Sequence, residues 1–259
     1  MSELIDVKVD GVIATVMLNR PEKLNALTKP MWQALGAAID RLSADDQLRC
    51  IIVRGAGEKA FSPGNDIAEF ATERANKQQA IEYGRVMHAT AHSLASCRHP
   101  LVAQIHGVCV GGGLEIAALC DLRICGESSR FGAPIKNLGL VMAYPEMAPL
   151  VRLAGADVAL EILLEGRIFG AAEAKEKRLV TRVVPDAQVE EEALATAQRI
   201  ADGAPLVARW HKAFARRLGD PRPLTPSEYD ACFDCFDTED FRIGYEAFLA
   251  KKKPAFVAR

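Results

Sequence analysis

The sequence predicts a layered α/β fold in which part of the strand pairing is parallel. Three patterns support this prediction: an alternating strand pair near the start, apolar strands that alternate with amphipathic helices, and a glycine-rich turn between a strand and a helix. With 259 residues, the chain is long enough for one large α/β core and an appendage. We expect the core in residues 1–200 and a helical C-terminal region in residues 201–259.

The first elements have clear patterns. Residues 5–9 and 12–18 alternate apolar and polar side chains on either side of Asp10-Gly11, which is a hairpin signal, so the two strands should be antiparallel. A threonine and a proline precede an amphipathic run over residues 31–42, which predicts a capped helix. The apolar run at 50–53 predicts the next strand.

The later elements continue the alternation up to about residue 145. Beyond that point helices predominate, with one short apolar segment at 179–184. The elements expected between these parts are a breaker-rich loop at 61–66, a helix at 78–96, a strand at 101–105, a strand at 105–110 before the glycines, a helix to Leu119 and a strand at 122–125.

The composition indicates which binding partners and which cellular compartment to expect. Charged residues make up 25% and the formal net charge is −2, so the chain lacks the positive field that attracts nucleic acid. The longest apolar passage, residues 101–119, is interrupted by polar residues and glycines, which argues against a membrane span. No basic and apolar leader pattern begins the sequence, and its seven cysteines have irregular spacing. We therefore expect a cytoplasmic protein that binds neither nucleic acid nor membrane.

Metal-ligating patterns are incomplete. Cys232 and Cys235 have no second cysteine pair, and His88 and His92 lack the adjoining glutamate of a zinc-protease motif. We expect no metal site.

The run Val110-Gly111-Gly112-Gly113-Leu114-Glu115 is the first candidate for a functional site. Glycines allow a backbone to approach a ligand closely, and the first amides of the following helix point outward unpaired. Neither a phosphate loop nor a dinucleotide fingerprint fits, because no Lys and Ser/Thr follow the glycines and the spacing is not Gly-x-Gly-x-x-Gly. Two interpretations remain. The run holds a transient oxyanion with Glu115 exchanging a proton beside it, or it is a tight turn whose glutamate favours the helix dipole.

A second loop, residues 60–67, offers another source of backbone amides. Two amides that converge on one oxygen form an oxyanion hole, and removing one donor costs about 3 to 4 kcal/mol. Two such loops would suit an enolate.

Five segments, in order, resemble the crotonase, or enoyl-CoA hydratase/isomerase, superfamily. They are residues 18–27, 60–67, 106–121, 131–134 and 239–256. The resemblance implies a crotonase-like spiral of ββα units and a helical C-terminal region that makes trimer contacts, in a homotrimer or a dimer of trimers. It also implies an acyl-CoA thioester as substrate, no metal, and no cofactor, since coenzyme A belongs to the substrate.

The resemblance also implies roles for individual residues. The backbone amides of Asn65 and Gly112 match the two donors to the thioester oxygen, and Glu115 matches the first catalytic glutamate of the hydratases. Acyl-pocket side chains are expected from loops such as residues 71–80. Substrate-binding positions are implied at Lys23, Leu24 and Ala26 near the adenine, at Ala60, Asp66, Ile67, Ala68, Gly111, Pro134 and Ile135, and, unless they form only a solvated tail, at Lys251, Lys252 and Lys253 near the CoA phosphates.

The chain departs from the family pattern at the second catalytic position. Ile135 stands where hydratases have their second glutamate, and Ala143 stands where the isomerase branch has its own. Tyr144 and Glu146 follow closely and could reach the acyl pocket; alternatively, Glu146 only meets the dipole at a helix start.

Three functions remain open from the sequence. The first is a hydratase/isomerase-type enzyme in which Glu115 is the acid/base. The second is an acyl-CoA decarboxylase, which needs the oxyanion hole and an apolar pocket of the kind Ile135 would line. The third is a non-catalytic acyl-CoA binder or assembly subunit.

Overall fold

Two sheets form the core of the computed structural model, which describes residues 3–259. The larger sheet has six strands in the order β1-β2-β3-β5-β7-β10, and every neighbouring pair except β1 and β2 is parallel. Its strands are β1 (Ile5–Asp10), β2 (Ile13–Leu18), β3 (Cys50–Gly55), β5 (Leu101–Ile105), β7 (Leu122–Gly126) and β10 (Arg182–Val184). The predicted antiparallel hairpin and the partly parallel α/β fold are confirmed.

The smaller sheet has four short strands in the order β4-β6-β8-β9. They are β4 (Ala60–Ser62), β6 (Val108–Val110), β8 (Arg130–Gly132) and β9 (Phe169–Gly170). Strands of two or three residues are too short to show a period of two, so the sequence predicted neither β8 nor β9 and assigned most of β4 to a loop.

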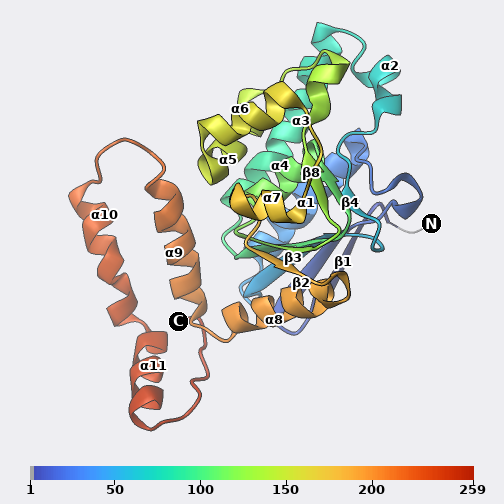
Figure 1. The fold of residues 1–259 in the computed structure, drawn as a ribbon. Helices are drawn as coiled ribbons and strands as arrows, with labels where there is room; N and C mark the ends of the chain where they lie inside the picture. The colour runs from blue at the N-terminus through green and yellow to red at the C-terminus, as the bar shows by residue number, and fades with distance from the viewer. Residues whose placement is uncertain (1–2) are drawn as a thin grey trace.

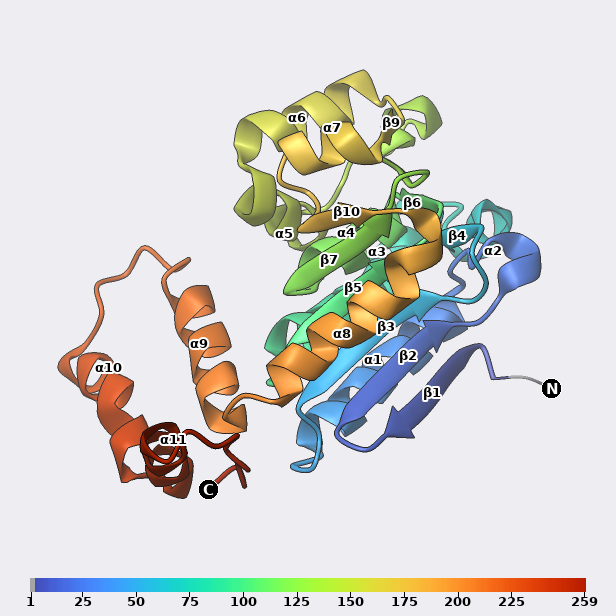
Figure 2. The ribbon, with the colours of Figure 1, turned by 60° about the horizontal axis from the view of Figure 1, so that its bottom comes forward.

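Helices cover both faces of the larger sheet (Figure 2). On one face lie α1 (Lys29–Ala44) and α3 (Lys77–Ser96), which pack against each other; on the other lies α8 (Val189–Ala201). The N-cap of α1 is as predicted, because the Thr28 hydroxyl accepts a hydrogen bond from the Met31 amide. The remaining core helices are α4 (Gly112–Leu119), α5 (Tyr144–Ala154), α6 (Ala156–Glu165) and α7 (Ala171–Glu176).

Two strand predictions need correction. The expected strand over 105–110 begins only at Val108, because Gly107 breaks the extended chain with φ +57°, and a Cβ there would lie 2.0 Å from the Lys59 carbonyl oxygen. In the apolar segment at 179–184, only β10 is a strand. Leu179 and Val180 are buried in the core before it begins.

Only helices follow α8 in the described chain, and they extend away from the two sheets (Figure 1). They are α9 (Pro205–Arg217), α10 (Pro226–Asp230), the 3-10 helix η5 (Ala231–Asp237) and α11 (Glu239–Leu249). An ion pair of 2.6 Å between Lys212 on α9 and Asp121 ties this region to the core. Across residues 3–259, no helix has both the length and the apolar character needed to cross a membrane.

Candidate active site

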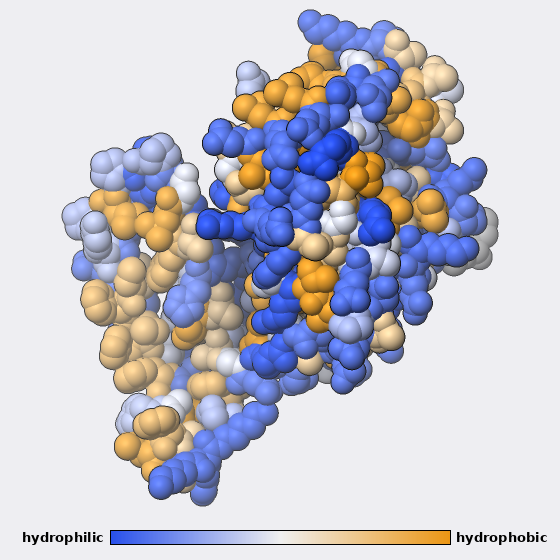
Figure 3. Space-filling model, in the orientation of Figure 1, coloured by the Kyte–Doolittle hydropathy of each residue, from blue (hydrophilic) through white to orange (hydrophobic). Residues whose placement is uncertain are grey.

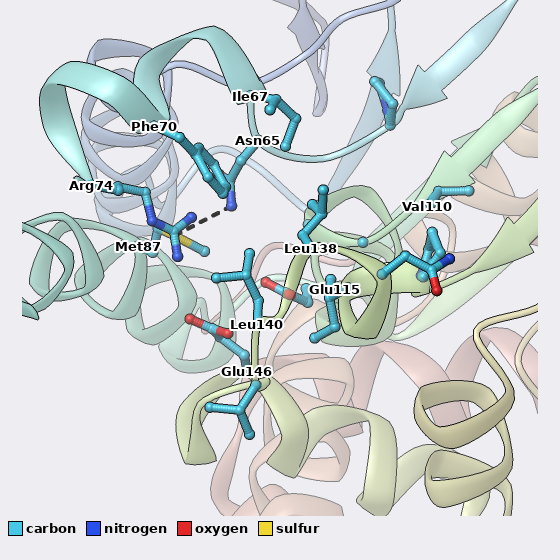
Figure 4. Close-up of a pocket in the computed structure, with 17 residues that line it drawn as sticks. Asn65, Ile67, Phe70, Arg74, Met87, Val110, Glu115, Leu138, Leu140 and Glu146 are labelled. Carbon is cyan, nitrogen blue, oxygen red and sulfur yellow. Dashed lines mark hydrogen bonds between the residues drawn. The ribbon is translucent and has the colours of Figure 1, made fainter. Parts of the chain in front are cut away.

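A cavity of about 270 Å³ lies among α2 (Phe70–Glu73), α3, α4 and the segment that joins β8 to α5 (Figure 4). Glu115, Glu146 and Arg74 are its charged lining residues. Most of the remaining wall is apolar and includes Ile67, Phe70, Met87, Ile135, Leu138, Leu140 and Val141.

Two loops meet at one side of this cavity and bring two backbone amides together. Gly64 has φ +95°, and a Cβ on it would lie 2.6 Å from the amide nitrogen of Gly112. Asn65 follows Gly64 directly, and both Asn65 and Gly112 line the cavity. Within residues 3–259, neither of their amides donates a hydrogen bond. Two unpaired donors side by side are the arrangement that an oxyanion hole requires.

The first of these loops is held from several directions. Its backbone pairs with Leu27 through two hydrogen bonds of 2.8 Å, and Arg20 forms an ion pair of 2.6 Å with Asp66. The Arg20 guanidinium holds the pKa of Asp66 below its usual range. The side chain of Asn65 adds a third anchor, because its Oδ1 accepts a 2.7 Å hydrogen bond from Nε1 of Trp32.

Glu115 enters the cavity from the first turn of α4. Burial and, second, the like charge of Glu146 raise the pKa of Glu115 to about 8, while Arg74 acts in the opposite direction. At neutral pH this carboxyl is therefore mostly protonated and can donate a proton.

Glu146 lines the same cavity from the first turn of α5, and its side chain is 14% exposed. One oxygen accepts a hydrogen bond of 3.0 Å from the Ala143 amide, and the other lies 3.2 Å from Nε2 of His88. The two interpretations of this residue are thus compatible, since it caps the helix and lines the cavity at the same time.

Tyr144 does not join the site. It is 91% exposed at the first position of α5 and does not line the cavity. Neighbouring positions on a helix point in different directions, so the turn that directs Glu146 inward leaves Tyr144 outside. Pro134 and Ile135 line the wall, as expected, and Ile135 makes this part of it apolar.

Several other expected binding residues lie outside the cavity. Ala60 is buried in β4, where its carbonyl accepts a hydrogen bond from Asn25, and Ala68 is exposed. Lys23 and Leu24 are exposed at the 3-10 helix η1 (Pro21–Lys23), and Ala26 is partly buried beside it. The Leu27–Asn65 pairing places this segment next to the amide loop.

The C-terminal lysines lie far from the cavity within one chain. Lys251, Lys252 and Lys253 follow α11, which is at the opposite end of the molecule from α2 (Figure 1). Lys253 forms an ion pair of 2.9 Å with Asp202.

Sequence reasoning missed several cavity residues. Arg74 comes from the 71–80 segment that was expected to supply the acyl pocket, but Phe70, Met87, Leu138 and Leu140 carried no recognisable signal. Across the described range 3–259, no group of three or more His, Cys, Asp and Glu side chains is arranged to hold a metal ion.

Comparison with known proteins agrees with this architecture. Residues 8–259 match the family model described as enoyl-CoA hydratase/isomerase. A short-chain-enoyl-CoA hydratase from Clostridium acetobutylicum is 31% identical over 246 residues, which is 94% of each chain. A probable enoyl-CoA hydratase from Rhizobium meliloti is 33% identical over 260 residues, which is 99% of each chain.

Solved structures show the same fold. An enoyl-CoA hydratase/carnitine racemase from Magnetospirillum magneticum superposes with a TM-score of 0.98 at 51% identity, covering 100% of this chain and 97% of that one. The enoyl-CoA hydratase of Bacillus anthracis gives a TM-score of 0.89 at 29% identity, covering 99% and 100%. The chain therefore belongs to the enoyl-CoA hydratase/isomerase family, the crotonase superfamily.

Proposed function

We propose that this chain adds water to the conjugated double bond of a 2-enoyl-CoA, with Glu146 as the general base and Glu115 as the general acid. Family membership makes it an acyl-CoA-processing enzyme of the hydratase/isomerase type. The observation that carries the specific reaction is that two carboxyl groups share one cavity beside two unpaired amides. Glu146 thus takes the place of the glutamate that is absent at Ile135.

The reaction balances with these groups alone. Glu146 takes a proton from water, and the water oxygen forms a bond to C3 of the enoyl group. The electron pair of the double bond moves toward the thioester oxygen, where the amides of Asn65 and Gly112 stabilise the enolate. Glu115 then gives its proton to C2, which yields a 3-hydroxyacyl-CoA, and solvent returns both carboxyls to their starting states. No cofactor takes part, because coenzyme A belongs to the substrate.

The environments of the two carboxyls support this assignment of acid and base. The raised pKa of Glu115, about 8, keeps its proton available at neutral pH. The carboxyl group of Glu146 is held in the cavity at both oxygens, by the Ala143 amide and by Nε2 of His88. Each carboxylate oxygen has a second lone pair that remains available for water.

The test offers crotonyl-CoA, a 3-enoyl-CoA and a malonyl-type CoA to the purified wild type, Glu115→Gln and Glu146→Gln. Absorbance of the conjugated thioester and the product mass report water addition, double-bond migration and decarboxylation. We expect hydration of crotonyl-CoA, with a loss of kcat of about 10²-fold or more in each variant. Glu127→Gln, an exposed glutamate outside the cavity, is the matched control and should behave as wild type.

Each alternative has its own result. Double-bond migration without hydration would assign an isomerase, and CO₂ release that is insensitive to Glu115→Gln would assign a decarboxylase. Binding of all three esters without turnover would identify a non-catalytic binder. Wild-type hydration in Glu146→Gln would remove Glu146 from the mechanism.

We also infer that the chain forms a homotrimer or a dimer of trimers through its C-terminal helices. Phe233 and Phe236 on η5 and Phe248 on α11 are exposed, and Figure 3 shows apolar residues gathered over this part of the C-terminal region. Sedimentation of the full-length chain would measure the assembly. A cytoplasmic location suits its seven cysteines, all of which carry free thiols.

A further inference from the structure

We propose that Arg74 is a specificity residue that binds a carboxylate at the far end of the substrate's acyl chain. This inference deepens the proposed function, on which it rests, by naming the class of acyl group: a chain with a thioester at one end and a carboxylate at the other.

The guanidinium of Arg74 packs against two aromatic rings and has no acceptor in residues 3–259. It lies over the rings of Phe70 and Tyr83, 4.7 Å and 5.0 Å from their centroids. Such contacts with aromatic rings do not use the N–H groups as hydrogen-bond donors to an oxygen. Within residues 3–259, the Arg74 side chain forms no hydrogen bond and has no carboxylate oxygen within 4.0 Å.

Arg74 is also the one cation among the described residues that line the cavity. In Figure 4 its side chain extends toward Met87, across the cavity from Val110, the residue just before the glycine run. An acyl chain whose thioester oxygen is held at the amides of Asn65 and Gly112 would lie in the same cavity that Arg74 lines.

Neither acidic residue of the cavity forms an ion pair with Arg74, although its charge acts on Glu115 from a distance. Glu146 already has His88 and the Ala143 amide as partners. Glu115 is mostly protonated at neutral pH, even though the charge of Arg74 lowers its pKa. A guanidinium group in a largely apolar pocket is suited to bind a carboxylate through two parallel hydrogen bonds. A substrate with a second carboxylate would supply the acceptor that Arg74 does not find in the protein.

Binding of saturated esters tests the inference without any turnover. Glutaryl-CoA and pentanoyl-CoA have five-carbon acyl groups and differ in a terminal carboxylate against a methyl group; adipoyl-CoA and hexanoyl-CoA repeat the comparison with six carbons. Affinities would be measured by calorimetry for the wild type, Arg74→Met, Arg74→Lys and Arg85→Met. Arg85 is exposed on α3 and outside the cavity, so its variant controls for the loss of one positive charge.

We expect the wild type and Arg85→Met to bind the carboxylated ester at least about tenfold more tightly than its uncharged pair, at one chain length or both. A charge-assisted hydrogen bond contributes about this much to affinity. The preference should disappear in Arg74→Met and be intermediate in Arg74→Lys, which keeps the charge but loses the fork. In kcat/KM, glutaconyl-CoA should exceed 2-pentenoyl-CoA in the wild type, and Arg74→Met should reverse this order.

Three results would overturn the inference. The wild type could bind the two esters of each pair with equal affinity at both lengths, or Arg74→Met could keep the wild-type ratio of the two affinities. Arg74→Met could also lose the same affinity for both esters and for free CoA, which would assign Arg74 to the CoA phosphates. Failure of hydration is a separate outcome, because the saturated esters report binding even if no enoyl-CoA is turned over.

Discussion

The indole nitrogen of Trp32 donates a hydrogen bond of 2.7 Å to Oδ1 of Asn65. This contact joins helix α1 to the loop that carries one of the two amides in the cavity. The Nδ2 atom of the same side chain lies 3.7 Å from the Met87 sulfur on α3. The sequence assigned Asn65 a role through its backbone amide alone, whereas these contacts make its side chain a positioning group for that amide.

Substituting Asn65 by Ala should therefore reduce kcat by about fivefold, since the partly buried hydrogen bond contributes about 1 kcal/mol to holding the amide in place. Trp32→Phe, which removes the other partner, should have a similar effect. The double variant should lose little more than either single variant, because both remove one interaction. Steady-state kinetics of the three proteins would measure this coupling, and strictly additive losses would contradict it.

Gly64 should not tolerate a methyl group. Its φ of +95° disfavours any L side chain, and the added carbon would lie 2.6 Å from the Gly112 nitrogen. Gly64→Ala should push the two amides apart and lower kcat by about 10²-fold or more. Gly57→Ala is the control, since Gly57 has φ +71° with nothing within 4 Å of the added carbon.

Gly57→Ala should lose about 1 kcal/mol of stability, as expected for a positive φ, and keep its activity. Urea unfolding of both variants separates lost folding from lost catalysis. Gly64→Ala with wild-type kcat would show that the two amides do not act as a pair.

The fold was predictable wherever elements were long enough to show a period. Helices α1 and α3 and the β1–β2 hairpin follow from their amphipathic and alternating patterns. The smaller sheet could not be predicted, because its short strands pair with strands that are distant in sequence, as β4 pairs with β6.

Some residues of the candidate site could be predicted from the sequence, and others could not. The glycine run and its glutamate could be recognised because they are contiguous in the chain. That Glu146 and Glu115 share a cavity could not be derived, since it depends on how α5 packs beside α4. Arg74 follows a helix of only four residues, which has no pattern to predict where its side chain points.

His88 should act by positioning Glu146. Its Nε2 lies 3.2 Å from Oε1 of that carboxylate, and it is not among the residues that line the cavity. His88→Leu removes this partner and should lower kcat by about tenfold with little change in KM, whereas His88→Gln can still donate a hydrogen bond and should keep most of the activity. Equal losses in the two variants would show that the hydrogen bond is not what matters at this position.

Glu115 should make folding less favourable as pH rises. Its pKa is raised to about 8 in the folded chain, against about 4.3 for an unfolded glutamate. Between these values the folded state binds more protons, so this residue's contribution to the free energy of unfolding falls with increasing pH. Glu115→Gln removes that contribution, and its stability relative to wild type should increase from pH 5 to pH 8.5. Urea unfolding at both pH values would measure the difference, and a difference independent of pH would contradict the raised pKa.

The pH dependence of kcat/KM should also report the protonation of Glu115. If Glu115 is the general acid, hydration requires its protonated form, and the rate should fall as pH rises through about 8.

Glu146 raises the pKa of Glu115 and Arg74 lowers it, so two substitutions should shift this alkaline limb of the pH profile in opposite directions. In the residual activity of Glu146→Gln the limb should move to lower pH, because a like charge has been removed. In Arg74→Met it should move to higher pH, because an opposite charge has been removed. Arg85→Met should leave the limb where it is in wild type, since Arg85 does not line the cavity. Limbs that coincide in all four proteins would mean that a group other than Glu115 controls the rate.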